Sequence, residues 1–113
     1  MRPFAFAVLL ALFISPAPAA QVAVCNLDAI PLDKRAEPTI SYTVAFPEQD
    51  QLRHKCGGDW AAPHDYLWGC AREAGEFWHI YIEKRLDDAN RACVELHEKS
   101  HLPPNLWVHA GSF

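Results

Sequence analysis

This chain has little of what marks several large protein classes. Its 10 lysines and arginines are outnumbered by 14 acidic residues, and the net charge is −4. Nucleic-acid-binding proteins and proteins that bind anionic membranes need a basic patch, so we expect neither partner. No internal repeat or low-complexity tract is visible, which argues against a repeat architecture. At 113 residues, the chain holds one domain at most.

Cysteines are few, and no two have the C-x-x-C spacing typical of redox or zinc-ribbon sites. The four that are present are Cys25, Cys56, Cys70 and Cys93. An even number in an exported chain indicates two disulfides. Four cysteines allow three pairings, among which the sequence alone cannot choose. Our preferred pairing is Cys25–Cys56 with Cys70–Cys93.

Long hydrophobic runs are also absent, apart from residues 4–14, which are too short to cross a bilayer. Arg2 precedes this run, and the small-residue sequence SPAPAA follows it. The pattern predicts a secretory signal peptide over residues 1–19, cleaved after Ala19. We therefore expect a single domain over residues 20–113, periplasmic or secreted, monomeric, and not inserted in a membrane after cleavage. Cleavage would remove the basic residue Arg2 and no acidic residue, so the remaining part would stay acidic.

Periodicity in this remaining part predicts a small α+β domain. Residues 39–46 alternate β-branched and aromatic residues with others, which predicts a strand. Residues 48–58 predict a short helix that ends at a glycine pair. Residues 66–71 and 76–84 predict a β-hairpin that turns at Gly75. Within its second strand, Phe77, His79 and Tyr81 should face one way, and Trp78, Ile80 and Ile82 the other.

Residues 86–102 predict one long helix. Asp87 or Asp88 can cap its N-terminus, and Pro103-Pro104 cannot continue it. At helical spacing, one stripe contains Ala89, Ala92, Cys93, Leu96, His97 and Ser100. The expected fold is thus a small twisted sheet with a hairpin, packed on one long helix and stapled by disulfides.

The long helix carries His97-Glu98-Lys99-Ser100-His101, an H-E-x-x-H motif. Residues four apart share a helix face, so the two imidazoles can reach one Zn²⁺ at about 2.0–2.1 Å. Glu98 can then serve as general base toward a water molecule whose pKa the metal lowers to about 7. A catalytic zinc needs a third protein ligand. His109, eight residues after His101, is the candidate, and His79 on the hairpin is its rival.

These residues resemble the zincin class of zinc metallopeptidases. Within it, the chain is similar to small exported or phage-encoded bacterial zincin-like proteins, which share an H-E-x-x-H…H motif and a G-C-A hairpin strand. Here that strand sequence is Gly69-Cys70-Ala71, and Ser100 matches the small residue before the second histidine. Metzincins have a glycine between the second and third histidines, where this chain has Pro103-Pro104-Asn105.

The resemblance implies a minimal zincin-like fold with zinc as cofactor. It implies metal ligation by His97, His101 and His109, and general-base catalysis by Glu98. It also implies a peptide or protein substrate that lies along residues 67–73 as an added strand.

Two other functions stay open. The first is a non-catalytic zincin-like envelope protein that binds a partner and keeps zinc for stability. The second is an ordinary helix end with exposed histidines and no metal, because histidine is favoured near helix C-termini. The four tryptophans could suggest carbohydrate stacking, but packing in a small domain explains them better.

Overall fold

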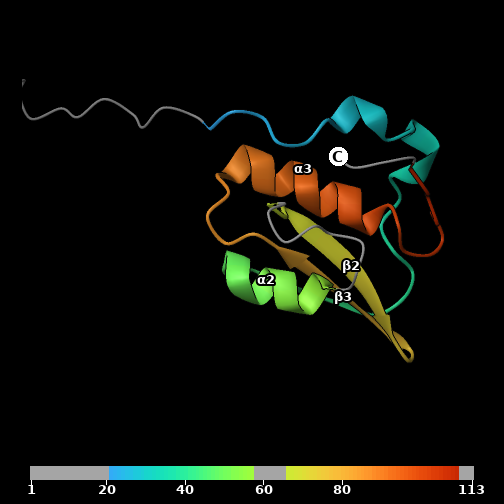
Figure 1. Ribbon diagram of the computed structural model, residues 1–113. Helices are drawn as coiled ribbons and strands as arrows, with labels where there is room; N and C mark the ends of the chain where they lie inside the picture. Colours follow the sequence, from blue (N-terminus) through green and yellow to red (C-terminus); the bar gives the residue numbers. More distant parts are fainter. Residues whose placement is uncertain (1–20, 58–65, 110–113) are drawn as a thin grey trace, which may run out of the picture.

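A three-stranded sheet between two α-helices organises residues 21–57 and 66–109, the part of the chain that the computed structural model describes (Figure 1). Its elements are the 3₁₀ turns η1 (Leu27–Ala29) and η2 (Leu32–Lys34), then β1 (Tyr42–Ala45), α2 (Gln49–Cys56), β2 (Gly69–Ala74), β3 (Phe77–Ile82) and α3 (Asp88–Lys99). This is the α+β class that the sequence predicts. The predicted signal peptide lies outside the described residues.

The sheet has the order β1-β3-β2. β1 runs parallel to β3, with Tyr42 opposite Trp78, and β2 runs antiparallel to β3, with Ala74 opposite Phe77. β3 is therefore the central strand, and β2 lies at an edge. The predicted hairpin is confirmed, with Gly75 at φ +64° in its turn, a backbone region open to glycine at no steric cost.

Two strand boundaries differ from the prediction. β2 begins at Gly69 and continues to Ala74, so residues 72–74 form strand where we predicted turn. A two-residue turn suffices to reverse the chain, which leaves those residues free to pair with β3. β1 is shorter than predicted, because the N–H of Thr39 donates to Pro103 O (3.0 Å) instead of joining the sheet.

The two faces of the sheet pack against different helices. One buried cluster contains Ile80, Ile82, Leu86, Val94 and Leu102 and lies between the sheet and α3. A smaller one contains Leu52, Cys56, Leu67 and Cys70, with Tyr81 packed against it, and lies on the α2 side. The predicted alternation along β3 is therefore confirmed, since its even-numbered residues face α3 and Tyr81 faces α2.

α3 begins where the sequence predicts. The side chain of Asp87 caps it by accepting from the N–H of Asn90 (2.9 Å). The predicted apolar stripe is wrong in part. Ala89 and Ala92 are exposed, and the buried residues of the helix are Asn90, Cys93, Val94, His97 and Glu98.

A polar contact explains this rotation of the buried face. Asn90 accepts from the N–H of Val24 (3.0 Å) and donates to Val22 O (3.0 Å). The N-terminal segment is thereby bound along α3, and Asn90 is buried with its hydrogen bonds satisfied. A pattern of apolar residues alone cannot reveal such a contact.

The two predicted disulfides exist, but our preferred pairing is wrong. The bonds join Cys25 to Cys93 and Cys56 to Cys70, with Cα–Cα distances of 6.0 and 5.8 Å. Cys56 ends α2 directly over β2, which places it beside Cys70 in the smaller cluster. Cys93 instead faces the N-terminal segment that crosses α3. Within the described ranges, no helix is long and apolar enough to span a membrane.

Candidate metal centre

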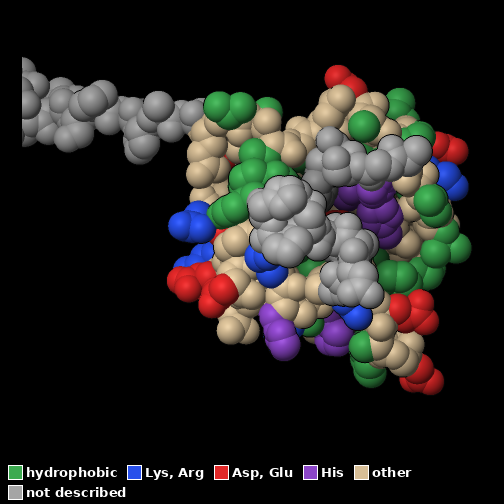
Figure 2. Space-filling view, viewed as in Figure 1, with side chains coloured by type: hydrophobic (Ala, Val, Ile, Leu, Met, Phe, Trp, Pro, Cys, Tyr) green, Lys and Arg blue, Asp and Glu red, His purple; other side chains and the backbone are tan. Residues whose placement is uncertain are grey.

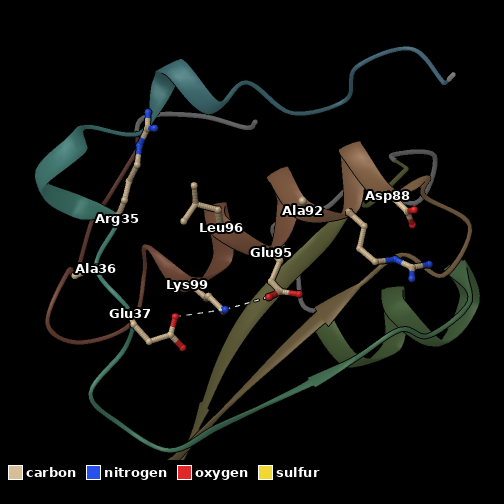
Figure 3. A pocket seen from close by; sticks show the side chains of 9 residues that line it. Arg35, Ala36, Glu37, Asp88, Ala92, Glu95, Leu96 and Lys99 are labelled. Atoms are coloured by element: carbon tan, nitrogen blue, oxygen red, sulfur yellow. Dashed lines mark ion pairs between the residues drawn. The ribbon is translucent and has the colours of Figure 1, made fainter.

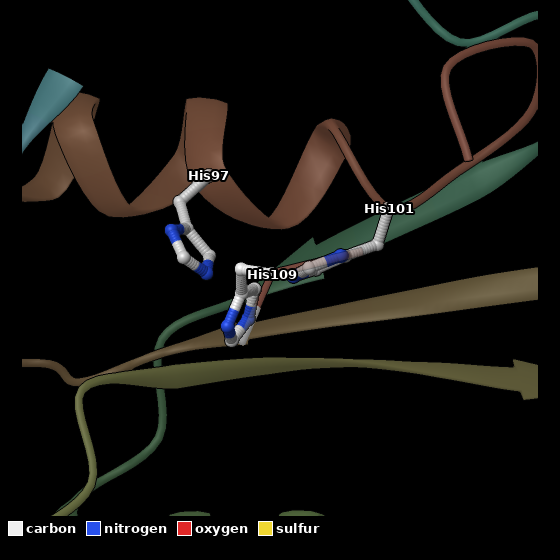
Figure 4. Close-up of side chains that lie close together, drawn as sticks. All are labelled: His97, His101 and His109. Carbon is white, nitrogen blue, oxygen red and sulfur yellow. The ribbon is translucent and has the colours of Figure 1, made fainter. Parts of the chain in front are cut away.

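Three histidines converge at the C-terminal end of α3 (Figure 4). Each offers a ligand atom, and these atoms all lie within 4.8 Å of one another. The ring centroids form a nearly equilateral triangle, with sides of 5.1 Å (His97–His101), 4.9 Å (His97–His109) and 5.0 Å (His101–His109). Ligands on one ion at about 2.1 Å stand about 3.4 Å apart, so small side-chain rotations separate this arrangement from a bound one. The three histidines can hold a metal ion.

His101 lies just beyond the last residue of α3 rather than within the helix. It keeps the face of His97 because Ser100 retains helical backbone angles and the N–H of His101 donates to Glu98 O (3.1 Å). His97 and His101 therefore share one face, as their spacing predicts, even though α3 ends at Lys99.

The chain returns to the site through residues 102–107. The N–H of Trp107 donates to Ser100 O (2.8 Å), which folds the segment back onto the helix end. Leu106 takes the left-handed conformation at φ +48°, and the Pro103–Pro104 peptide is cis. Asn105 fastens the bend by donating to Ala36 O (2.7 Å) and accepting from the N–H of Ala36 (3.2 Å). No glycine is used in this turn.

His101 has its ring orientation set by the backbone. Its Nδ1 lies 2.8 Å from Trp107 O. A carbonyl oxygen only accepts, so Nδ1 must carry a proton, and the lone pair of the neutral ring is on Nε2. Metal-binding histidines are typically held in this way, with the nitrogen that does not bind the metal donating to a carbonyl or carboxylate.

Trp107 contacts all three histidine rings. It stacks on His101 at an interplanar angle of 9° (5.7 Å between centroids) and meets His97 edge-on at 78° (5.3 Å). Its centroid lies 5.2 Å from that of His109. Edge-to-face and offset arrangements of this kind are favourable between aromatic rings.

Glu98 is buried beside the histidines, with 3% of its surface exposed. Its Oε1 lies 3.8 Å from His101 Nε2, and its Oε2 is buried without a hydrogen-bond partner. Burial raises the pKa of this carboxyl to about 8. At neutral pH and without a metal, the Glu98–His101 contact is thus between a protonated acid and a neutral ring, not an ion pair.

The surroundings of His97 and His101 favour their neutral, metal-binding form. Burial, with smaller contributions from His101 and His109, lowers the pKa of His97 to about 3. Burial also lowers the pKa of His101. His109 Nδ1 is buried without a hydrogen-bond partner. Unpaired buried polar atoms are rare in proteins, and two of them lie in this site, on Glu98 and His109.

His79 does not join this group. It lies on β3, and its Nδ1 is 2.7 Å from Thr43 Oγ1. Its side chain shares a strand face with Tyr81, which packs on the α2 side, whereas the three histidines lie on the α3 side. The structure thus brings together His97, His101 and His109, and leaves out the rival third ligand.

Ion pairs lie on the side of α3 that faces away from the histidines. Lys99 pairs with Glu95 (3.0 Å) and Glu37 (3.6 Å), as the dashed lines in Figure 3 show. These residues line a surface pocket of about 370 Å³ that does not include the histidines. Histidine surface is visible over the C-terminal end of α3 in Figure 2. The candidate metal centre and the charged pocket are separate features.

Two contributors to the site were not predicted. The sequence predicts only general packing for Trp107, although a separation of two residues from His109 would place both side chains on one side of an extended segment. For Gly69 the sequence indicates only a place in a strand motif. A Cβ at Gly69 would lie 2.8 Å from Tyr81 O and from Val94 Cγ1, and 3.6 Å from Glu98 Cγ. This glycine allows α3, and Glu98 with it, to approach β2.

No protein-family model matches the chain, and neither a curated protein nor a solved structure matches it significantly.

Proposed function

We propose that this chain is an exported zinc-dependent hydrolase with a zincin-like fold, most simply a metallopeptidase. The observation that carries the proposal is the convergence of His97, His101 and His109 beside the buried Glu98 carboxyl. Three imidazole ligands favour zinc over the hard ions, which prefer oxygen ligands. Two disulfides within a small domain support export to an oxidising compartment.

The roles of the residues follow from their positions. His97, His101 and His109 would hold the zinc ion, which would leave a fourth position open, polarise a carbonyl and lower the pKa of water. The charge of a bound ion would favour the ionised form of Glu98. Glu98 would then accept a proton from water, because its Oε1 lies next to His101 Nε2. The hydrogen bond from His101 to Trp107 O keeps that nitrogen in the binding tautomer.

A peptide substrate would be held by the edge of the sheet. β2 is an edge strand, and Gly69 at its start lies against Val94 and near Glu98. Edge strands offer unpaired backbone groups to an extended peptide. A peptide added along β2 would therefore pass close to the proposed general base.

A second function is favoured by the burial of the site. His97 is only 4% exposed, and Trp107 packs against all three ligand rings. A closely packed centre of this kind also suits a zinc ion that stabilises a non-catalytic binding protein of the cell envelope.

The Glu98→Gln variant separates the two functions. Wild-type protein, with zinc and with a chelator, is incubated with a library of quenched fluorescent peptides. We expect zinc-dependent cleavage that Glu98→Gln abolishes while its zinc content stays the same, and His79→Ala serves as the matched histidine control that keeps activity. If wild type cuts no peptide while chelation unfolds it, the zinc is structural.

A further inference from the structure

We propose that Trp107 is the positioning residue of the metal centre, and that it acts through both its carbonyl and its indole ring. This inference rests on the proposed zinc site. Tryptophan is not a metal ligand, and the H-E-x-x-H pattern does not include Trp107.

The carbonyl of Trp107 acts on one ligand. It accepts from His101 Nδ1 at 2.8 Å, which fixes the ring orientation and leaves Nε2 for the metal. The carbonyl is itself placed by the adjoining backbone, since the N–H of Trp107 donates to Ser100 O (2.8 Å). The helix end and the returning segment are thus joined at the residue that orients His101.

The indole acts on all three ligands together. It lies parallel to the His101 ring, edge-on to His97, and 5.2 Å from His109 between centroids. His97 and His101 come from the helix end, whereas His109 comes from a segment whose neighbour, Val108, is 85% exposed. A rigid ring with only two rotatable side-chain bonds can hold these ligands in one geometry before metal binds, so less ordering is required on binding.

The test measures zinc affinity by chelator competition in wild type, Trp107→Ala, Trp107→Phe and Trp107→Leu. Loss of a residue that orients metal ligands typically costs 10–100-fold in affinity. We expect a loss in this range for the alanine and leucine variants, and recovery of most of it with phenylalanine, which restores a ring. Trp78→Ala is the matched control: this half-buried tryptophan packs in the cluster beneath α3, so its loss should lower the melting temperature and not the zinc affinity.

A second measurement follows the carbonyl. Nitrogen-15 NMR of the histidine rings should show His101 protonated at Nδ1, both without zinc and with zinc bound at Nε2, in wild type and equally in Trp107→Ala, because alanine keeps the backbone carbonyl; protonation at Nε2 in wild type would overturn the role of the carbonyl. The visible spectrum of the Co²⁺ form should change in the alanine variant and be restored by phenylalanine.

The outcomes separate the two proposals. Failure of wild type to bind zinc would contradict the metal site itself. Wild-type binding with unchanged affinity and Co²⁺ spectrum in Trp107→Ala would leave the metal site standing and overturn the role of the indole. If the alanine variant does not fold, equal affinities for the phenylalanine and leucine variants would overturn it in the same way.

Discussion

Glu98→Gln should change how the stability of the zinc-free protein depends on pH. The folded-state pKa of Glu98 is raised to about 8 from an ordinary 4.5, by burial. Between these values the folded protein keeps a proton that the unfolded chain has released. Rising pH therefore destabilises the folded state over this range.

The magnitude follows from the pKa difference. One pKa unit corresponds to 1.36 kcal/mol, so Glu98 should remove about 2–3 kcal/mol of stability between pH 5 and pH 7. No discount for solvent is needed, because only 3% of the residue is exposed. Glutamine has nearly the same shape and no proton to lose. The stability advantage of Glu98→Gln over wild type should grow by that amount across the range.

The assay is urea unfolding of both proteins with a chelator present, at half-unit steps of pH. The pKa of His97 is lowered to about 3, so this residue makes stability rise with pH between about pH 3 and 6.5. His97 is present in both proteins, so its contribution cancels when the stability of wild type is subtracted from that of Glu98→Gln. A stability difference that stays constant with pH would show that Glu98 is already ionised in the folded, metal-free protein, and would refute the reasoning.

Three further predictions concern the frame around the site. The Cys25–Cys93 disulfide constrains the unfolded chain by closing a loop with a separation of 68 residues. Paired serine substitution removes this constraint and should cost about 4 kcal/mol of stability. Non-reducing peptide mapping should recover this pair, and its absence would contradict the pairing. Gly69→Ala should cost about 1–3 kcal/mol by calorimetry, because the new Cβ meets the immobile backbone oxygen of Tyr81 at 2.8 Å; an unchanged melting temperature would be inconsistent with this contact. Asp87→Ala should lower the melting temperature at neutral pH and have little effect well below pH 4, because backbone N–H donors lower the pKa of this cap and its contribution is lost as it protonates; an effect that persists in acid would argue against a charged cap.

Local features of this protein were readable from the sequence. The hairpin, the alternation along β3 and the Asp87 cap depend on neighbours a few residues apart, and all three are confirmed. The shared face of His97 and His101 is local in the same sense, since one helical turn separates them.

What could not be predicted depends on long-range packing. The disulfide pairing follows from which segment crosses α3, and that is decided by contacts such as Asn90 with Val24, 66 residues apart. The return of His109 depends on Asn105, which bonds to Ala36 across 69 residues. Trp107 could not be distinguished from the other tryptophans by composition, because its role comes from the bend that places it.

The most direct test of the central claim is the zinc content of the protein purified without a histidine tag, grown with zinc and passed through gel filtration. We predict one zinc per chain for wild type and for His79→Ala. His109→Ala should lose bound zinc, while its circular dichroism spectrum shows that the fold is retained. A wild-type protein with well below one equivalent of zinc, or a His109→Ala variant that binds as tightly as wild type, would contradict the three-histidine centre.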